Sequence, residues 1–405
     1  MTSQVAIMNL RGIAVASDTV LSRTSAAGTK TMGNTGKIYE LGPEHKILIL
    51  HSACSDLNDV PVSVYIGDWS QTLVAPLPRL HDYVDSFMKW ASRDTHIQGQ
   101  YSSQGVMSAA LDEHFRWMQR RCNSIISNNH QIEGESPAKF AKRLEKLIES
   151  ELQDGYEFLG DFELFRGMTD ESALEILKAN TYDLEKWIDA FFSEIPLTEQ
   201  AREILRLSAP RSIARAQELS DTDVVLAFVG FGAEEPFAGS IKVTTRGIYG
   251  GKMRAIVADR FGVAVDDKTG IVHYAQGDAI SAFLRGADWK ILNRMKSFIE
   301  GKLNDIAAQH SIELDVAGTM TELSSDIEDF AHEKFVSPLL GTVEAMGMRS
   351  LSDFAESLVA LQATSSYAKD GPATVGGFIE VATIDRVKGV SWIKALGTTG
   401  SELYR

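Results

Sequence analysis

The stretch that decides the fold is MTSQVAIMNLRGIAVASD, residues 1–18. Apolar residues alternate with small or polar ones from Val5 to Ile7 and again from Ile13 to Val15. This period of two is typical of half-buried strands, and the segment between them contains a predicted turn. The sequence therefore predicts that the chain opens with two short strands around a turn.

The rest of the chain alternates between strand-rich and helix-rich regions. Residues 19–36 are rich in Thr, Ser, Gly and Asn, which predicts a loop, and strands are predicted at 37–41 and 46–50. A helical pattern follows from about residue 60 to 220. Further strands are predicted from 224 onwards, helices at 289–309 and 351–367, and a closing strand pair at 377–385 and 389–394. Such segregated strands and helices favour an α+β protein over repeated βαβ units.

Several helix starts in the middle region carry their own local signals. Ser136 precedes Pro137, a typical N-cap followed by proline in the first helical position. Thr169 and Thr198 each precede acidic residues, which favour the positive end of a helix. The sequence thus predicts helices that begin after these three residues.

Composition limits the class of protein. The chain has 405 residues, 44% of them hydrophobic, and a net charge of −15. No basic stripe offsets that charge, so we expect no nucleic-acid partner. Only two cysteines are present, which favours a reducing compartment, and we expect a cytoplasmic protein. No secretory pattern and no run of eighteen apolar residues is found, so we expect no membrane partner.

Thr2 is the candidate nucleophile. It follows the initiator Met1 directly, and threonine is small enough for that methionine to be removed. A free α-amine titrates near pH 8 and can take the proton of the neighbouring hydroxyl. A lysine ammonium near Thr2 would lower the pKa of both groups, and an aspartate beside that lysine would balance its buried charge.

The sequence around Thr2 resembles the proteasome β-subunit and HslV-like peptidases, which are N-terminal nucleophile hydrolases. The resemblance rests on Thr2, on the strand that ends at Asp18, and on Gly36-Lys37 at the start of a later strand. Asp18 stands at the family spacing, and Lys37 requires an insertion of about three residues in the loop between, where insertions are tolerated. The resemblance implies that Thr2 is the nucleophile, Lys37 its electrostatic activator and Asp18 the residue that orients Lys37.

Further segments resemble the same family. Ser52-Ala53 stand where the family has a glycine pair, so the backbone of Ser52 would stabilise the oxyanion. Asp370 stands near the position of the family's second acidic partner. Two serines that usually assist the threonine are replaced, by Gln276 and by Val375.

The resemblance implies a four-layer αββα sandwich interrupted by an all-helical insertion. Its first half would span residues 1–80, the insertion 81–220 and the second half 221–405. The implied function is a threonine peptidase that cleaves peptides or unfolded proteins through an acyl-enzyme. The implied assembly is a homo-oligomer, with an ATP-dependent unfoldase as an open possibility. No metal and no organic cofactor is implied.

Other interpretations of the same residues stay open. The protein would alternatively be a non-peptidase amidohydrolase of the same superfamily, or an inactive scaffold or regulator that keeps Met1. Asp18 alone would also fit a residue that caps a turn, and Lys37 a solvated charge at a strand edge. Residues 247–252 superficially resemble a phosphate-binding loop but lack its glycine spacing and its final hydroxyl, so we predict a turn there.

Overall fold

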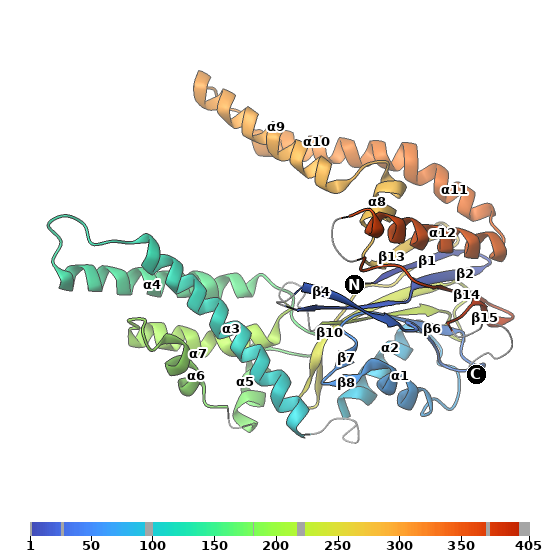
Figure 1. The fold of residues 1–405 in the computed structure, drawn as a ribbon, viewed down its shortest axis with the longest axis horizontal. Helices are drawn as coiled ribbons and strands as arrows, with labels where there is room; N and C mark the ends of the chain where they lie inside the picture. Colours follow the sequence, from blue (N-terminus) through green and yellow to red (C-terminus); the bar gives the residue numbers. More distant parts are fainter. Residues whose placement is uncertain are drawn as a thin grey trace.

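The computed structural model describes residues 2–25, 28–93, 100–180, 182–216, 223–369 and 373–396. It shows a mixed α and β protein whose sheets are antiparallel (Figure 1). The first sheet has the order β13-β1-β2-β14-β15. Its strands are β1 (Ser3–Asn9), β2 (Gly12–Asp18), β13 (Thr269–Ala275), β14 (Ile379–Asp385) and β15 (Gly389–Lys394).

The predicted opening hairpin is confirmed, and it lies at the centre of this sheet. Every residue of β1 and β2 is buried. β1 pairs with β2 and β13, and β2 pairs with β14, so both strands have a neighbour on each side. Alternation then sends Ala6 and Met8 to one face of the sheet and Val5 and Ile7 to the other.

The second sheet has the order β11-β10-β9-β6-β5, with a short strand, β12, paired to β10. Its strands are rich in valine and isoleucine, residues that fit a pleated, buried surface. They are β5 (Ile38–Glu40), β6 (Ile47–Ala53), β9 (Val224–Gly230), β10 (Gly239–Tyr249), β11 (Lys252–Val257) and β12 (Phe261–Gly262).

Three apolar cores hold these layers together. One core lies between the two sheets and joins residues such as Met8 and Val15 of the first sheet to Leu48 and Val229 of the second. On the outer face of the first sheet, α8 (Asp278–Arg285), α11 (Ser337–Ala345) and α12 (Met348–Tyr367) share a core with β1 and β2. On the outer face of the second sheet, α1 (Val62–Ser70) and α2 (Leu80–Arg93) do the same.

The prediction of a loop at residues 19–36 is wrong. Its described residues form a hairpin of β3 (Val20–Ser25) and β4 (Gly28–Asn34), paired antiparallel. Threonine favours extended backbone, and the polar composition reflects a hairpin that pairs only with itself rather than a structureless segment. A smaller hairpin, β7 (Asp56–Leu57) with β8 (Val60–Pro61), precedes α1.

A group of helices projects from one side of the sheets (Figure 1). It has its own apolar core, to which Tyr249 of β10 also contributes. The predicted starts are confirmed, because the side chains of Ser136, Thr169 and Thr198 each accept a hydrogen bond from the third helical residue. The helices are α3 (Gln100–Asn128), α4 (Pro137–Gly160), α5 (Asp170–Ala179), α6 (Leu184–Phe192) and α7 (Glu199–Ala214).

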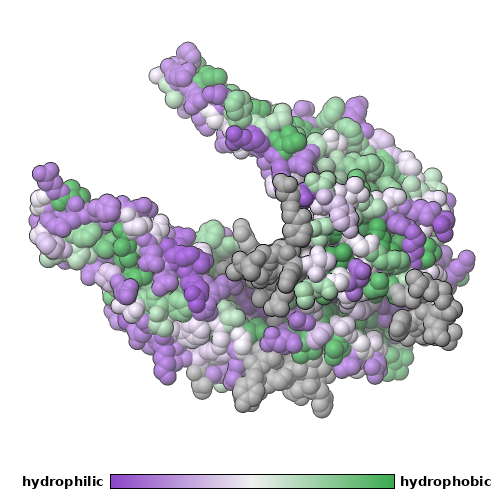
Figure 2. Space-filling view, in the orientation of Figure 1, coloured by the Kyte–Doolittle hydropathy of each residue, from purple (hydrophilic) through white to green (hydrophobic). Residues whose placement is uncertain are grey.

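A second projection is built from α9 (Trp289–His310) and α10 (Val316–Ala331), which a π-helical turn (His332–Val336) joins to α11. The predicted helix at 289–309 is confirmed, yet neither α9 nor α10 has a buried residue. The two projections extend from the sheets in a similar direction, and Figure 2 shows a broad hollow between them.

Candidate functional site

Thr2 lies directly before β1. Its exposed fraction is only 5%. Its carbonyl oxygen accepts a hydrogen bond of 2.8 Å from the backbone N–H of Gln276. The preceding residue, Ala275, ends β13 in the left-handed backbone region, with φ of 59°. The end of β13 therefore fixes the backbone on which Thr2 is carried.

Asp18 lies beside Thr2, fully buried at the end of β2. Its Oδ1 atom accepts hydrogen bonds of 2.9 Å from the backbone N–H of Ser3 and from Lys37 Nζ. Its Oδ2 atom accepts one of 3.1 Å from the backbone N–H of Gly376. One carboxylate thus links the start of β1, the lysine before β5 and the loop before β14.

Lys37 stands one residue before β5, and its ammonium is directed inwards. Besides Asp18, Lys37 Nζ donates to the carbonyl oxygen of Val20 at 2.8 Å. Burial lowers the pKa of Lys37, and the negative charge of Asp18 opposes that effect. The side chains of Asp18 and Lys37 are therefore in contact. Asp18 also binds the backbone N–H of Ser3, the residue that follows Thr2.

Glu380 is a buried acid of this region that the sequence analysis did not single out. Its Oε2 atom accepts a hydrogen bond of 3.0 Å from the backbone N–H of Lys37. Burial raises the pKa of Glu380, while backbone donors such as Lys37 N–H counteract the shift. The sequence shows only a glutamate inside a predicted strand, next to Val381. It does not indicate that this glutamate binds the backbone of Lys37.

A pocket of about 240 Å³ opens beside these residues. Thr2, Lys37 and Ser52 all contribute to its wall, together with residues from β3, β6 and the β7–β8 hairpin. None of its lining residues belongs to α3–α7. The wall is completed by Val20, Leu21, Ser22, Thr35, Gly36, Tyr39, His51, Ala53, Ser55, Asp56, Pro61 and Ser63.

Ser52 and Ala53 end β6 at this pocket. The Ser52 side chain is buried, and among the described residues its Oγ atom has no hydrogen-bond partner. Ala53 has φ of 68°, in the left-handed region that residues with a Cβ rarely adopt. The backbone turns sharply here, which is the place where the sequence predicts an oxyanion-binding N–H.

His51 lines the pocket, and no pattern in the sequence pointed to it. Its Nε2 atom lies 2.7 Å from the carbonyl oxygen of Cys54, and its own carbonyl accepts from Gln4 Nε2 at 2.9 Å. Burial lowers its pKa, so the imidazole is neutral at neutral pH. A neutral ring that donates through Nε2 keeps an acceptor at Nδ1.

The loop before β14 is described only in part. Asp370 lies outside the described residues. Val375 is fully buried, and the hydroxyl of the preceding Thr374 lies 3.4 Å from Gln276 Oε1, a long hydrogen bond. A hydroxyl thus stands one residue before Val375, the position at which the family that the sequence resembles has a serine. In the sequence, the threonine next to Val375 was the only sign of this hydroxyl.

Comparisons with known proteins give little beyond this geometry. No family model and no curated protein matches the chain. Among solved structures, the chain is similar to the Anbu (Gly-1) mutant from Hyphomicrobium sp. strain MC1. That similarity covers 97% of this chain and 86% of the other, with 10% identity and a TM-score of 0.30. Values this low do not assign the chain to a family.

Two further kinds of site are absent from the described residues. No group of three or more metal-ligating side chains is gathered in them. None of their helices combines the length and the apolar character that crossing a bilayer requires.

Proposed function

We propose that the protein is a threonine-type N-terminal nucleophile hydrolase, and that its layers of helices and sheets form the αββα sandwich of that superfamily. One observation carries the proposal. Asp18 accepts hydrogen bonds from Ser3 N–H and Lys37 Nζ, while Thr2 and Lys37 share the wall of one pocket. A buried cation held beside a terminal hydroxyl and amine is the arrangement that activates a threonine nucleophile.

The reaction follows from these groups once Met1 has been removed. The Thr2 hydroxyl oxygen attacks the carbonyl carbon of an amide, and its proton passes to the Thr2 α-amine. The resulting ammonium donates that proton to the leaving nitrogen as the C–N bond breaks, which leaves an ester on Thr2. The amine then takes a proton from water, whose oxygen attacks the ester. The ester C–O bond breaks as the ammonium returns the proton to the Thr2 oxygen, so the products are the amine released in the first step, a carboxylic acid and free Thr2.

Lys37 and Asp18 act on this chemistry through charge. The ammonium of Lys37 stabilises the deprotonated Thr2 oxygen and disfavours protonation of the Thr2 amine. Asp18 holds Lys37 in position and reduces the cost of its burial. The developing oxyanion would be stabilised by a backbone N–H near Ser52, where β6 ends.

Peptides are the substrate class that the pocket favours. Its volume of about 240 Å³ is smaller than the roughly 300–1,000 Å³ of typical small-molecule sites, and suits one side chain of an extended substrate. The wall includes residues of β3, which among the described strands pairs only with β4, so its other edge is suited to pair with a peptide strand. A pocket closed by the helical projection would favour an enzyme that acts on small amides. No described residue of that projection lines this pocket.

The test begins with intact mass of the cellular protein, in which Met1 is expected to be absent. A β-lactone probe should then add one acyl group to wild type and to Thr2→Ser, and none to Thr2→Ala. Labelling of a control variant, Thr31→Ala, should match wild type. Retention of Met1, or full labelling of Thr2→Ala, would exclude Thr2 as the nucleophile and favour the inactive scaffold. Cleavage of a small amide but of no peptide would favour the amidohydrolase.

A further inference from the structure

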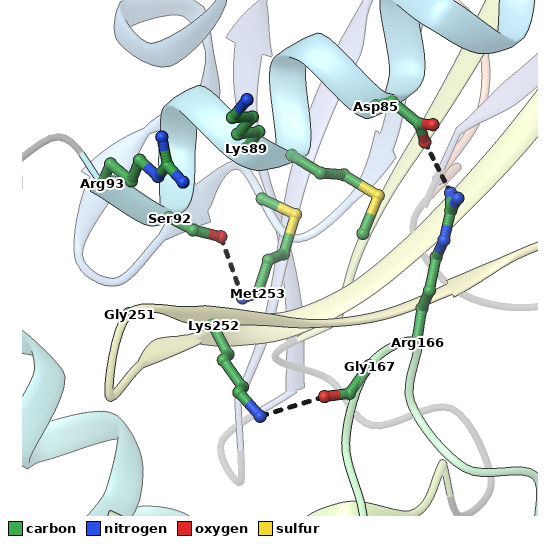
Figure 3. A pocket seen from close by; sticks show the side chains of 10 residues that line it. Asp85, Lys89, Ser92, Arg93, Arg166, Gly167, Gly251, Lys252 and Met253 are labelled. Carbon is green, nitrogen blue, oxygen red and sulfur yellow. Dashed lines mark hydrogen bonds and ion pairs between the residues drawn. The ribbon is translucent and has the colours of Figure 1, made fainter.

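A second pocket, of about 360 Å³, lies away from the Thr2 pocket and shares none of its lining residues. Three parts of the chain meet there (Figure 3): the last turns of α2, the Arg166-Gly167 segment after α4, and the turn between β10 and β11. That turn contains Gly251 and Lys252 from the sequence that superficially resembles a phosphate-binding loop. Its glycines at 250 and 251 have φ of 59° and 69°, consistent with the predicted turn.

Hydrogen bonds join the walls of this pocket to one another. Ser92 Oγ accepts from the backbone N–H of Met253 at 3.1 Å, which links α2 to β11. Lys252 Nζ donates to the carbonyl oxygen of Gly167 at 3.0 Å, and Arg166 Nη1 donates to Asp85 Oδ1 at 2.7 Å (Figure 3). The site is therefore held in shape before any ligand binds, which reduces the entropy lost on binding.

The charge of this pocket is opposite to that of the whole chain. Four of its lining side chains are basic, namely those of Lys89, Arg93, Arg166 and Lys252, and one is acidic, Asp85. The chain itself carries 40 basic and 55 acidic residues. Asp85 is paired with Arg166, so the other three cations have no carboxylate partner among the described residues. A local excess of positive charge in a concave surface attracts anions.

The arrangement of these cations works against the stability of the free protein. Lys89 and Arg93 are exposed and stand four residues apart on α2, where like charges face each other. Neither makes an ion pair within the described part of the chain. An anion bound between them would remove this repulsion.

The pocket is also lined by side chains that can donate hydrogen bonds to a ligand. Lys89, Arg93 and Lys252 offer only donors. The Ser92 hydroxyl accepts from Met253 N–H, and its own proton is not donated to any described residue. Met88 and Met253 add polarisable, apolar surface. The pocket therefore complements a ligand that carries several acceptor oxygens and a compact organic part.

We propose that this pocket binds a small multivalent oxyanion, with a phosphorylated small molecule as the favoured ligand. Several phosphate oxygens can accept charge-assisted hydrogen bonds from Lys89, Arg93 and Lys252 together, and from the Ser92 hydroxyl. The volume suits a ligand of metabolite size. This inference does not depend on the proposed hydrolase, because no residue of the Thr2 site takes part.

The test is isothermal titration of the full chain with inorganic pyrophosphate, triphosphate and citrate at constant ionic strength near 0.15 M. Wild type and Thr2→Ala are expected to bind at least one of them saturably at one site. Tighter binding of pyrophosphate or triphosphate identifies a phosphate ligand, and tighter binding of citrate identifies a polycarboxylate. The variant Lys89→Gln/Arg93→Gln is expected to bind about tenfold more weakly or worse, because two charge-assisted contacts are lost.

The matched control is Lys142→Gln/Lys146→Gln. These lysines are also exposed and four residues apart, on α4, and they lie outside the pocket. This variant carries the same change in net charge and should bind as wild type does, within about twofold. The proposal fails if both double variants lose affinity equally, or if wild type binds none of the three anions saturably. Because the substituted residues are exposed, thermal unfolding should confirm that both variants fold.

Discussion

Lys37 Nζ lies 2.9 Å from Asp18 Oδ1, and the two side chains are 5% and 0% exposed. An ion pair buried this deeply depends on both partners, because each compensates the cost of burying the other. The carboxylate is also held by two backbone N–H groups, from Ser3 and Gly376. The pair therefore serves the stability of the fold and the position of the charge beside Thr2 at once.

Replacing Asp18 with asparagine should strongly destabilise the protein. The substitution keeps the shape but leaves the Lys37 ammonium buried without its ion-pair partner, which costs about 3–5 kcal/mol of unfolding free energy. Urea unfolding at pH 7 measures this loss. The double variant Asp18→Asn/Lys37→Met also removes the unpaired buried charge. It should recover a large part of the lost unfolding free energy.

The exposed pair of Asp112 and Arg116 provides the control for that experiment. Its side chains are 40% and 58% exposed, so Asp112→Asn should cost less than about 1 kcal/mol. Equal stability of wild type and Asp18→Asn would show that the buried pair contributes little.

The rate of acylation should depend on pH through two groups. It is expected to rise as the α-amine of Thr2 loses its proton, below about pH 8, because the Lys37 ammonium disfavours protonation of that amine. The rate is then expected to fall at a pH below 10.5, because burial lowers the pKa of Lys37. The activating charge is lost when the Lys37 side chain loses its proton. The measurement is the rate of β-lactone labelling from pH 6 to 11. A rate that still rises at pH 10.5 would contradict a role for the Lys37 charge.

Replacing Ala53 with glycine should stabilise the protein by up to about 1 kcal/mol. Ala53 has φ of 68°, where a Cβ atom is strained and glycine is not. The matched control is Ala233→Gly, because Ala233 is also exposed but does not have a positive φ. The control should lose stability through the greater freedom of the unfolded chain. Thermal unfolding of both variants checks this, and a loss in Ala53→Gly equal to that in the control would show that no strain is present.

Acid should weaken the helical projection through His114. This side chain is 3% exposed, with Nε2 2.8 Å from Ser208 Oγ, and burial lowers its pKa to about 3. Below pH 6.5 the unfolded chain binds a proton that the folded protein does not, so stability falls as pH falls. The expected contribution is a loss of about 2 kcal/mol at pH 5.

Unfolding of wild type and His114→Gln at pH 7.5 and pH 5 measures this contribution. The pH-dependent loss should be smaller in the variant, while the exposed His130→Gln should lose as much as wild type. Part of the loss should persist in every variant, because burial also lowers the pKa of His45, His51 and His273. An unchanged loss in His114→Gln would show that His114 is not responsible.

Local patterns in the sequence were enough to place many elements. The alternation in residues 1–18 predicted the central hairpin, because its period matches the two faces of a strand. The three helix starts at Ser136, Thr169 and Thr198 were predicted because a cap is a contact within four residues. The hairpin of β3 and β4 was missed, because polar threonines fit a loop and an exposed strand equally well.

Long-range contacts in the candidate site lay beyond such patterns. Glu380 meets the backbone of Lys37 across 343 residues. The Thr374 hydroxyl meets Gln276 across 98 residues. The basic pocket joins Lys89, Arg166 and Lys252, which no pattern in the sequence associates.

The sequence by itself determined the strand that follows Thr2, the strand that ends at Asp18 and the spacing of both residues to Lys37, because these follow from side-chain periodicity and chain length. Only the tertiary structure decided that the Asp18 carboxylate joins Ser3, Lys37 and Gly376 in one buried cluster. The physical reason is that burial and charge pairing depend on which strands become neighbours. The pairing of β2 with β14 across most of the chain brings that cluster together.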